Sequence, residues 1–113
     1  MVNDNIAPQA VSDFRLTSKI AEKRIREAAL LSQNVIFSDH AFERMDERGI
    51  TDIQVLDILR TGMVLEEPEK TSQGEWKCKI IKELRGRRDA GVIVIIITNG
   101  KLFLKTVEWE DLK

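Results

Sequence analysis

The hydrophobic pattern of this chain changes its period once, near Met63, and this change constrains the fold more than any other feature. Before Met63, apolar residues recur every three or four positions, as on the buried face of a helix. After Met63 they alternate or run together, as they do in strands. Helices followed by strands are typical of α+β proteins, whose helices pack on one face of an antiparallel sheet. We therefore predict an α+β fold, with two to three N-terminal helices packed on a three- to four-stranded antiparallel sheet.

Helix signals before Met63 are local and specific. The predicted helices cover roughly residues 12 or 17 to 33, 38 to 49 and 51 to 62. Ser38 is a good N-cap for the second helix, and Gly49 is a natural C-terminal stop. Thr51 and Gln54 have the spacing of a capping box at the start of the third helix. The apolar segment Val35–Phe37 is either a short strand or the lead into the second helix.

Strand signals follow Met63. The predicted strands cover residues 63–66, 76–84, 92–98 and 101–109, with a polar loop at 68–75 and a basic, turn-rich connection at 85–91. The continuous β-branched run from Val92 is typical of a central strand covered on both faces. Asn99-Gly100 is the strongest hairpin signal in the chain.

The length of 113 residues fits one domain. We assign residues 1–11 to a polar N-terminal arm and residues 12–113 to a single α+β domain. The longest apolar run, Val92 to Ile97, is too short to cross a membrane, and the first ten residues lack the features of a signal peptide. Cys78 is the only cysteine, so no internal disulfide can form and a cytoplasmic location is expected. Its alternation with Trp76 and Ile80 predicts a buried, unreactive thiol.

The second helix carries the pattern most suggestive of catalysis. His40, Arg44 and Arg48 are spaced four residues apart, so they project along one side of the helix. Two guanidiniums can hold a phosphate, and a neutral imidazole near a helix N-terminus can exchange protons with a ribose 2′-hydroxyl. Such a reaction needs no metal or cofactor, and one His with one Cys is a poor basis for a zinc site. The ordinary alternative is a solvated helix face, in which Arg44 pairs with Glu47. The residues expected to meet the core from the opposite side are Ala41, Phe42 and Met45.

A second feature is a run of cations after the polar loop. The candidate nucleic-acid-binding residues in this run are Lys77, Lys79, Arg85, Arg87 and Arg88. A hairpin with these side chains could lie along a phosphate backbone, or it could simply be a charged hairpin tip. Acidic residues cluster elsewhere in the sequence, at 66–69 and 108–111, which predicts an electrically two-sided molecule. The net charge of −1 counts against nucleic acid, because nucleic-acid binders are usually basic.

The segment from Ser38 to Thr51 resembles a bacterial family catalogued as domain of unknown function 4258, whose hallmark is His-Ala-x-x-Arg-Met-x-x-Arg-Gly-Ile. The resemblance covers roughly residues 37 to 109 and includes Trp76-Lys77, Val92 to Ile97 and Thr106-Val107. The element order of the family is similar to that of RelE-type toxins and barnase-like ribonucleases, which is an analogy of fold alone. The resemblance implies that the first site candidates are His40, Arg44 and Arg48, followed by Lys79 and Arg87.

Three interpretations of function stay open at this point. The first is a toxin-type domain that binds RNA or cleaves it as a metal-independent endoribonuclease. The second is a non-catalytic interaction module that binds a protein partner, such as an antitoxin, by strand addition or through the first helix. The third is a structural homo-oligomer. A ribonuclease needs His40 close to the basic hairpin, whereas an interaction module needs an exposed apolar stripe or a bare strand edge.

Overall fold

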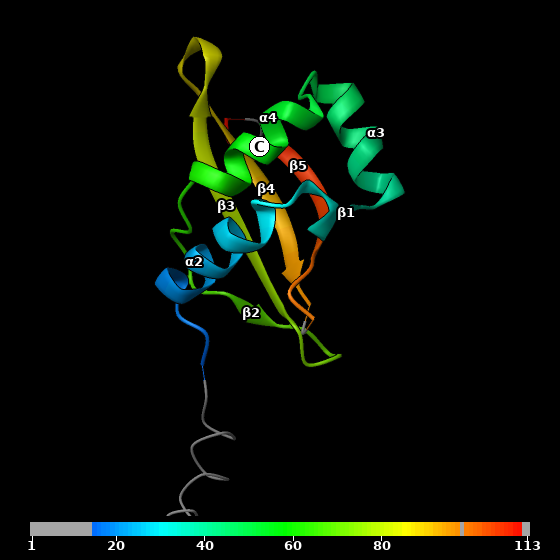
Figure 1. Cartoon of the computed structure of the whole chain (residues 1–113). Helices are drawn as coiled ribbons and strands as arrows, with labels where there is room; N and C mark the ends of the chain where they lie inside the picture. The colour runs from blue at the N-terminus through cyan, green and yellow to red at the C-terminus, as the bar shows by residue number, and fades with distance from the viewer. Residues whose placement is uncertain (1–14, 98, 112–113) are drawn as a thin grey trace, which may run out of the picture.

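A computed structural model describes residues 15–97 and 99–111 (Figure 1). The polar arm at residues 1–11, the alternative helix start at Ser12 and the end of a predicted strand at Thr98 lie outside the described residues. The helical elements are α2 (Ser18–Ala29), η1 (Ser32–Asn34), α3 (Asp39–Arg48), α4 (Asp52–Thr61) and η2 (Arg85–Arg87). The strands are β1 (Val35–Phe37), β2 (Glu69–Lys70), β3 (Trp76–Leu84), β4 (Arg88–Ile96) and β5 (Leu102–Trp109). The predicted α+β class is confirmed.

The ends of the helices follow the local capping signals. The Ser38 hydroxyl accepts a hydrogen bond from the Ala41 amide at 3.0 Å, and Gly49 closes α3 with a φ of 68°. Thr51 and Gln54 form the predicted capping box. The first helix ends at Ala29 rather than at residue 33, because the chain tightens there into the 3₁₀ turn η1.

The sheet has five strands in the order β1-β5-β4-β3-β2 within the described part of the chain. Strands β2 to β5 pair antiparallel, but β1 pairs parallel with β5, with Val35 opposite Leu102. The predicted purely antiparallel sheet of three to four strands was therefore wrong in strand number and in type. The physical reason is that two helices and three strands separate β1 from β5 in the sequence. No turn joins the two strands directly, so no hairpin signal could predict that they pair.

Two further strand predictions need correction. Of the predicted strand 63–66, only Met63 pairs, in an isolated bridge with Ile81, and the pairing strand β2 lies inside the predicted loop. Strand β4 begins at Arg88 rather than at residue 92, because the β3–β4 ladder continues to the pair Leu84–Arg88. The turn is therefore tight, and it is closed by Gly86 with a φ of 77°.

The helices cover one face of the sheet, and the core lies between the two layers (Figure 1). Along β4 the helix-facing side chains Val92 and Val94 are fully buried, whereas Ile93 and Ile95 on the opposite face are half-buried. The β-branched run of β4 thus has one covered face and does not mark the two-sided burial that was predicted.

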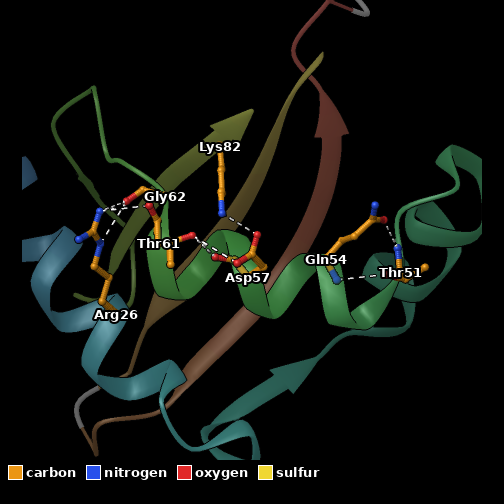
Figure 2. Close-up of polar contacts among 7 residues, drawn as sticks. All are labelled: Arg26, Thr51, Gln54, Asp57, Thr61, Gly62 and Lys82. Atoms are coloured by element: carbon orange, nitrogen blue, oxygen red, sulfur yellow. Dashed lines mark hydrogen bonds and ion pairs between the residues drawn. The ribbon is translucent and has the colours of Figure 1, made fainter. Parts of the chain in front are cut away.

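Polar contacts anchor α4 between its neighbours (Figure 2). Arg26 of α2 donates through Nε to the Gly62 carbonyl at 3.2 Å, which satisfies a free carbonyl at the end of α4. From the other side, Lys82 of β3 donates to the Asp57 carboxylate at 2.7 Å. These contacts fix α4 relative to both the first helix and the sheet.

Candidate nucleic-acid interface

Ser38 positions the helix that carries the candidate catalytic residues. Besides capping α3, its hydroxyl donates to the Lys105 carbonyl at 3.2 Å, and its amide donates to the Leu104 carbonyl at 3.2 Å. Both acceptors belong to β5. The N-terminus of α3 is therefore held against the middle of the last strand, and the helix runs along β5 from that point (Figure 1).

His40 lies in the first turn of α3 with an exposed side chain. No residue of the described segments 15–97 and 99–111 forms a hydrogen bond or an ion pair with its imidazole. The imidazole is thus accessible from solvent and is not engaged in holding the fold.

The two arginines of α3 have different surroundings. The Arg44 side chain is half-buried and forms an ion pair with Glu47. Arg48 donates through Nη1 to the Val107 carbonyl at 3.0 Å, and its own carbonyl accepts a bond from the indole Nε1 of Trp109 at 2.9 Å. Arg48 therefore docks the end of α3 onto β5 through one of the five N–H donors of its guanidinium and through its main-chain carbonyl.

The lysines of β3 are paired with acids. Lys77 lies 3.7 Å from the Glu69 carboxylate of β2. Lys79 donates to Glu108 at 3.1 Å and to Glu110 at 2.9 Å, across β4. Partial desolvation lowers the pKa of Lys79, but the hydrogen bonds and charges of Glu110 and Glu108 outweigh it, so the pKa is raised. Lys79 stays charged, and that charge is already balanced by two carboxylates.

Arg88 is also committed to local contacts. Its guanidinium stacks over the Trp109 ring at 4.2 Å and binds Asp111 through two hydrogen bonds, of 3.2 and 3.0 Å. The bond from Arg88 is the main cause that lowers the pKa of Asp111. Through Trp109, the structure brings Arg88 and the main chain of Arg48 together at one end of the sheet.

Arg85 and Arg87 occupy the η2 turn at the tip of the β3–β4 hairpin. Both side chains are exposed, and no acid in the described part of the chain pairs with either of them. Of the five cations predicted to bind nucleic acid, these two present guanidiniums that the described structure does not neutralise.

His40 and the hairpin tip are far apart. The N-terminus of α3 is held at Leu104, which lies opposite Val94 in β4. From Val94 to the tip at Arg87 the strand extends for roughly 20 Å. Along α3 itself, His40 and Arg48 are about 12 Å apart. The structure therefore arranges the candidates along an extended surface and does not gather His40 and the tip into one pocket.

The prediction that basic and acidic side chains lie on separate sides of the molecule was wrong for Lys77, Lys79 and Arg88. The acids of 66–69 and 108–111, distant in sequence, are sheet neighbours of the lysines and of Arg88. Sequence analysis noted these acids but did not predict that Glu69, Glu108, Glu110 and Asp111 would lie beside the basic side chains. No local signal was available for this contact, because a register shift between Ile93 and Val94 in the β4–β5 pairing places Glu108 opposite Gly91, whereas unbroken alternation from the Asn99-Gly100 hairpin would place it opposite Ala90.

Metal and membrane chemistry find no support in the described residues. Residues 15–97 and 99–111 contain no group of three or more His, Cys, Asp or Glu side chains that could hold a metal ion. No helix in these residues is long and apolar enough to span a membrane. Cys78 is buried, as predicted, and burial raises the pKa of its thiol to about 12.

Fold and surface together define a small α+β domain with helices on one sheet face and an exposed histidine at the start of α3. The chain belongs to the family described as domain of unknown function (DUF4258), whose model matches residues 37–109. The match begins just before α3 and ends with β5, so it contains every candidate residue named above. No curated protein and no solved structure matches the chain.

Proposed function

We propose that this protein is a small RNA-binding domain of the RelE toxin type, in which His40 acts as the general base or acid of a metal-independent endoribonuclease. The observation that carries the proposal is the His40 imidazole, which is exposed at a helix N-terminus and engaged by no described residue. A structural histidine is normally held by a hydrogen bond or buried. This one is available for chemistry.

The proposed reaction uses groups of α3. A neutral His40 would remove the proton from a ribose 2′-hydroxyl, and the oxygen would then attack the adjacent phosphorus. The bond from phosphorus to the 5′-oxygen of the next nucleotide would break, which leaves a 2′,3′-cyclic phosphate, and the imidazolium would return its proton to the departing 5′-oxygen. Arg44, one helical turn away, would offset the charge that builds up on the phosphate oxygens. Arg44 is paired with Glu47, so its guanidinium would have to leave this ion pair to contact the phosphate. Arg48 contributes mainly by fixing α3 on β5, and its charge adds to the field along the helix.

RNA would follow an extended path rather than enter a pocket. Single-strand binders combine a basic track with sites several nucleotides long, and the separation between His40 and the hairpin tip suits such a track. Arg85 and Arg87 would supply the phosphate contacts at its far end. The cations that already have acidic partners, Lys77, Lys79 and Arg88, would contribute less. The single buried cysteine is compatible with work in a reducing cytoplasm.

The test combines RNA binding and cleavage in EDTA. Fluorescence anisotropy with labelled single-stranded RNA, repeated at several salt concentrations, would compare wild type with Arg85→Ala, Arg87→Ala and His40→Ala. Each arginine variant should bind more weakly and reduce the slope of log K against log salt by about 0.7. His40→Ala should keep its affinity and lose cleavage, whereas Arg44→Ala should lose most of the cleavage.

Lys23→Ala is the matched control, because Lys23 is an exposed lysine of α2 outside the proposed path. It should leave binding and cleavage unchanged. Binding without cleavage would reduce the proposal to an RNA-binding module. Absence of both activities from a folded wild-type sample would refute it and favour a non-catalytic interaction module.

A further inference from the structure

One face of the sheet is covered by no helix in the part of the chain that the structure describes (Figure 1). Side chains alternate between the two faces of a strand, and Leu102 and Leu104 of β5 are buried on the helix-covered face. Phe103 therefore lies on the open face, opposite Ile95 of β4 and Ile36 of β1. Phe103 is half-buried, so part of its surface is accessible from solvent.

Lys101 precedes Phe103 by two residues. Its carbonyl accepts a hydrogen bond from the Ile97 amide at 2.9 Å, which continues the pairing of β4 and β5 beyond Leu102. By the alternation of a strand, the Lys101 side chain shares the open face with Phe103. No acid in residues 15–97 and 99–111 pairs with this lysine.

Lys105 is the extra residue in a bulge of β5. The β4–β5 register shifts between Ile93 and Val94, and Lys105 is the residue of β5 that has no partner there. The preceding residue, Leu104, is buried in the core, so the Lys105 side chain leaves the strand on the open face. Lys105 is exposed, and no described acid pairs with its ammonium group.

The bulge lies beside the start of α3. The Ser38 hydroxyl donates to the Lys105 carbonyl at 3.2 Å, and His40 is two residues further along the chain. Since successive Cα atoms are about 3.8 Å apart, the Cα atoms of Lys105 and His40 are separated by roughly 15 Å at most. Both side chains can therefore contact one short segment of RNA.

His40 and Phe42 lie on opposite sides of α3, because two residues of a helix are about 200° apart around its axis. Phe42, predicted to meet the core, is instead 52% exposed and stacks on Phe37 at a ring distance of 5.1 Å. Phe37 packs against the core on the helix-covered face, opposite Leu104. The side of α3 that carries His40 is therefore turned toward the open face of the sheet, where Lys105 lies.

The acids near this surface do not neutralise its lysines. Glu108 lies on the same face of β5, but Lys79 donates to it at 3.1 Å. Asp39, next to Ser38, forms no ion pair with Lys105. The open face of β5 thus carries a partly exposed aromatic side chain between two positive charges that the described structure does not balance.

We infer that this face of β5 is a stacking platform for single-stranded RNA, in which one base stacks on Phe103 and the phosphates on either side contact Lys101 and Lys105. The inference rests on the proposed function, because it takes the proposed RNA as its ligand. Stacking on aromatic side chains beside a positively charged track is how proteins hold single strands without reading their sequence. The platform extends the RNA path from His40 in the direction away from the η2 tip.

Fluorescence anisotropy with a labelled single-stranded 2′-O-methyl RNA, which cannot be cleaved through its 2′-oxygen, tests the platform in the full chain. Phe103→Leu keeps an apolar side chain but removes the aromatic ring, and should weaken binding by at least about fivefold. Phe103→Tyr keeps the ring and should bind like wild type. Phe42→Leu is the matched control, because Phe42 is exposed on the other side of α3, and should leave the affinity unchanged.

Salt dependence tests the two lysines. Lys101→Ala and Lys105→Ala should each reduce the slope of log K against log salt by about 0.7. Lys23→Ala, on the exposed side of α2, should not change the slope.

A duplex of the same sequence separates stacking from a general effect on the fold. Phe103→Leu should leave the affinity for the duplex unchanged, because a duplex offers no unpaired base to the ring. An equal loss for duplex and single strand, or unchanged single-strand binding by Phe103→Leu and both lysine variants, would overturn the inference and leave the proposed function standing. A wild type that binds no single-stranded RNA would overturn both.

Discussion

Two glycine-to-alanine substitutions should have very different costs, although both add a methyl group to a buried position. At Gly62, a Cβ atom would lie 2.6 Å from the Ile58 carbonyl oxygen and 2.8 Å from the Ile81 carbonyl oxygen. Both obstacles are backbone atoms, one in α4 and one in β3. Relief requires the helix and the strand to move apart, so we expect Gly62→Ala to lower the free energy of unfolding by about 2–3 kcal/mol.

At Gly91 the obstacle is flexible. A Cβ atom there would lie 2.5 Å from Glu110 Oε2 and 3.0 Å from Lys79 Cδ, and both side chains can rotate away. Their ion pair is partly exposed, so its loss costs roughly 0–1 kcal/mol. Alanine in place of glycine within a strand returns about 0.5–1 kcal/mol. The two effects nearly cancel, and Gly91→Ala should change the stability by less than about 0.5 kcal/mol.

Urea unfolding followed by circular dichroism measures both variants. With a slope of about 1.5 kcal/mol per molar urea, Gly62→Ala should move the midpoint down by roughly 1.3–2 M, whereas Gly91→Ala should leave it almost unchanged. Equal shifts for the two variants, or a larger shift for Gly91→Ala, would refute the reasoning that the rigidity of the obstructing atoms decides the cost.

Three further predictions concern the sheet end and the core. Trp109→Phe keeps a ring under Arg88 but removes the indole bond to the Arg48 carbonyl, and should cost about 1 kcal/mol in urea unfolding. The pKa of Asp111 is lowered in the folded state, so its contribution to stability is present above its ordinary pKa and is lost as the pH falls through the lowered value. The stability difference between wild type and Arg88→Met should therefore shrink in acid, and a constant difference would contradict this. Cys78, whose pKa burial raises to about 12, should resist iodoacetamide at mildly alkaline pH until urea unfolds the chain.

Much of the helical layer was predictable because its signals act within one turn of the chain. Ser38 caps α3 through the Ala41 amide, three residues away, and Thr51 and Gln54 satisfy each other's amides at the same spacing. The strands β3 and β5 were also predicted closely, since alternation and the Asn99-Gly100 turn are local features. These elements needed no knowledge of what packs against them.

The candidate site was predicted less completely. The sequence placed His40 and Arg44 on one helix, but it could not show that the Arg48 side chain would donate a hydrogen bond to the Val107 carbonyl. It also could not show that Glu110 would reach Lys79. Both contacts join residues from different elements, so they depend on how those elements pack.

The sequence by itself determined the order of the helices and the helix caps, because these depend on residues close together in the chain. Only the tertiary structure decided that β1 joins the sheet in parallel with β5. It also decided which cations remain unpaired, since sheet register brings carboxylates from distant segments to some of them and leaves Arg85 and Arg87 in solvent. Which strands pair, and in which register, depends on contacts between segments that are distant in the sequence. Local sequence patterns do not determine those contacts.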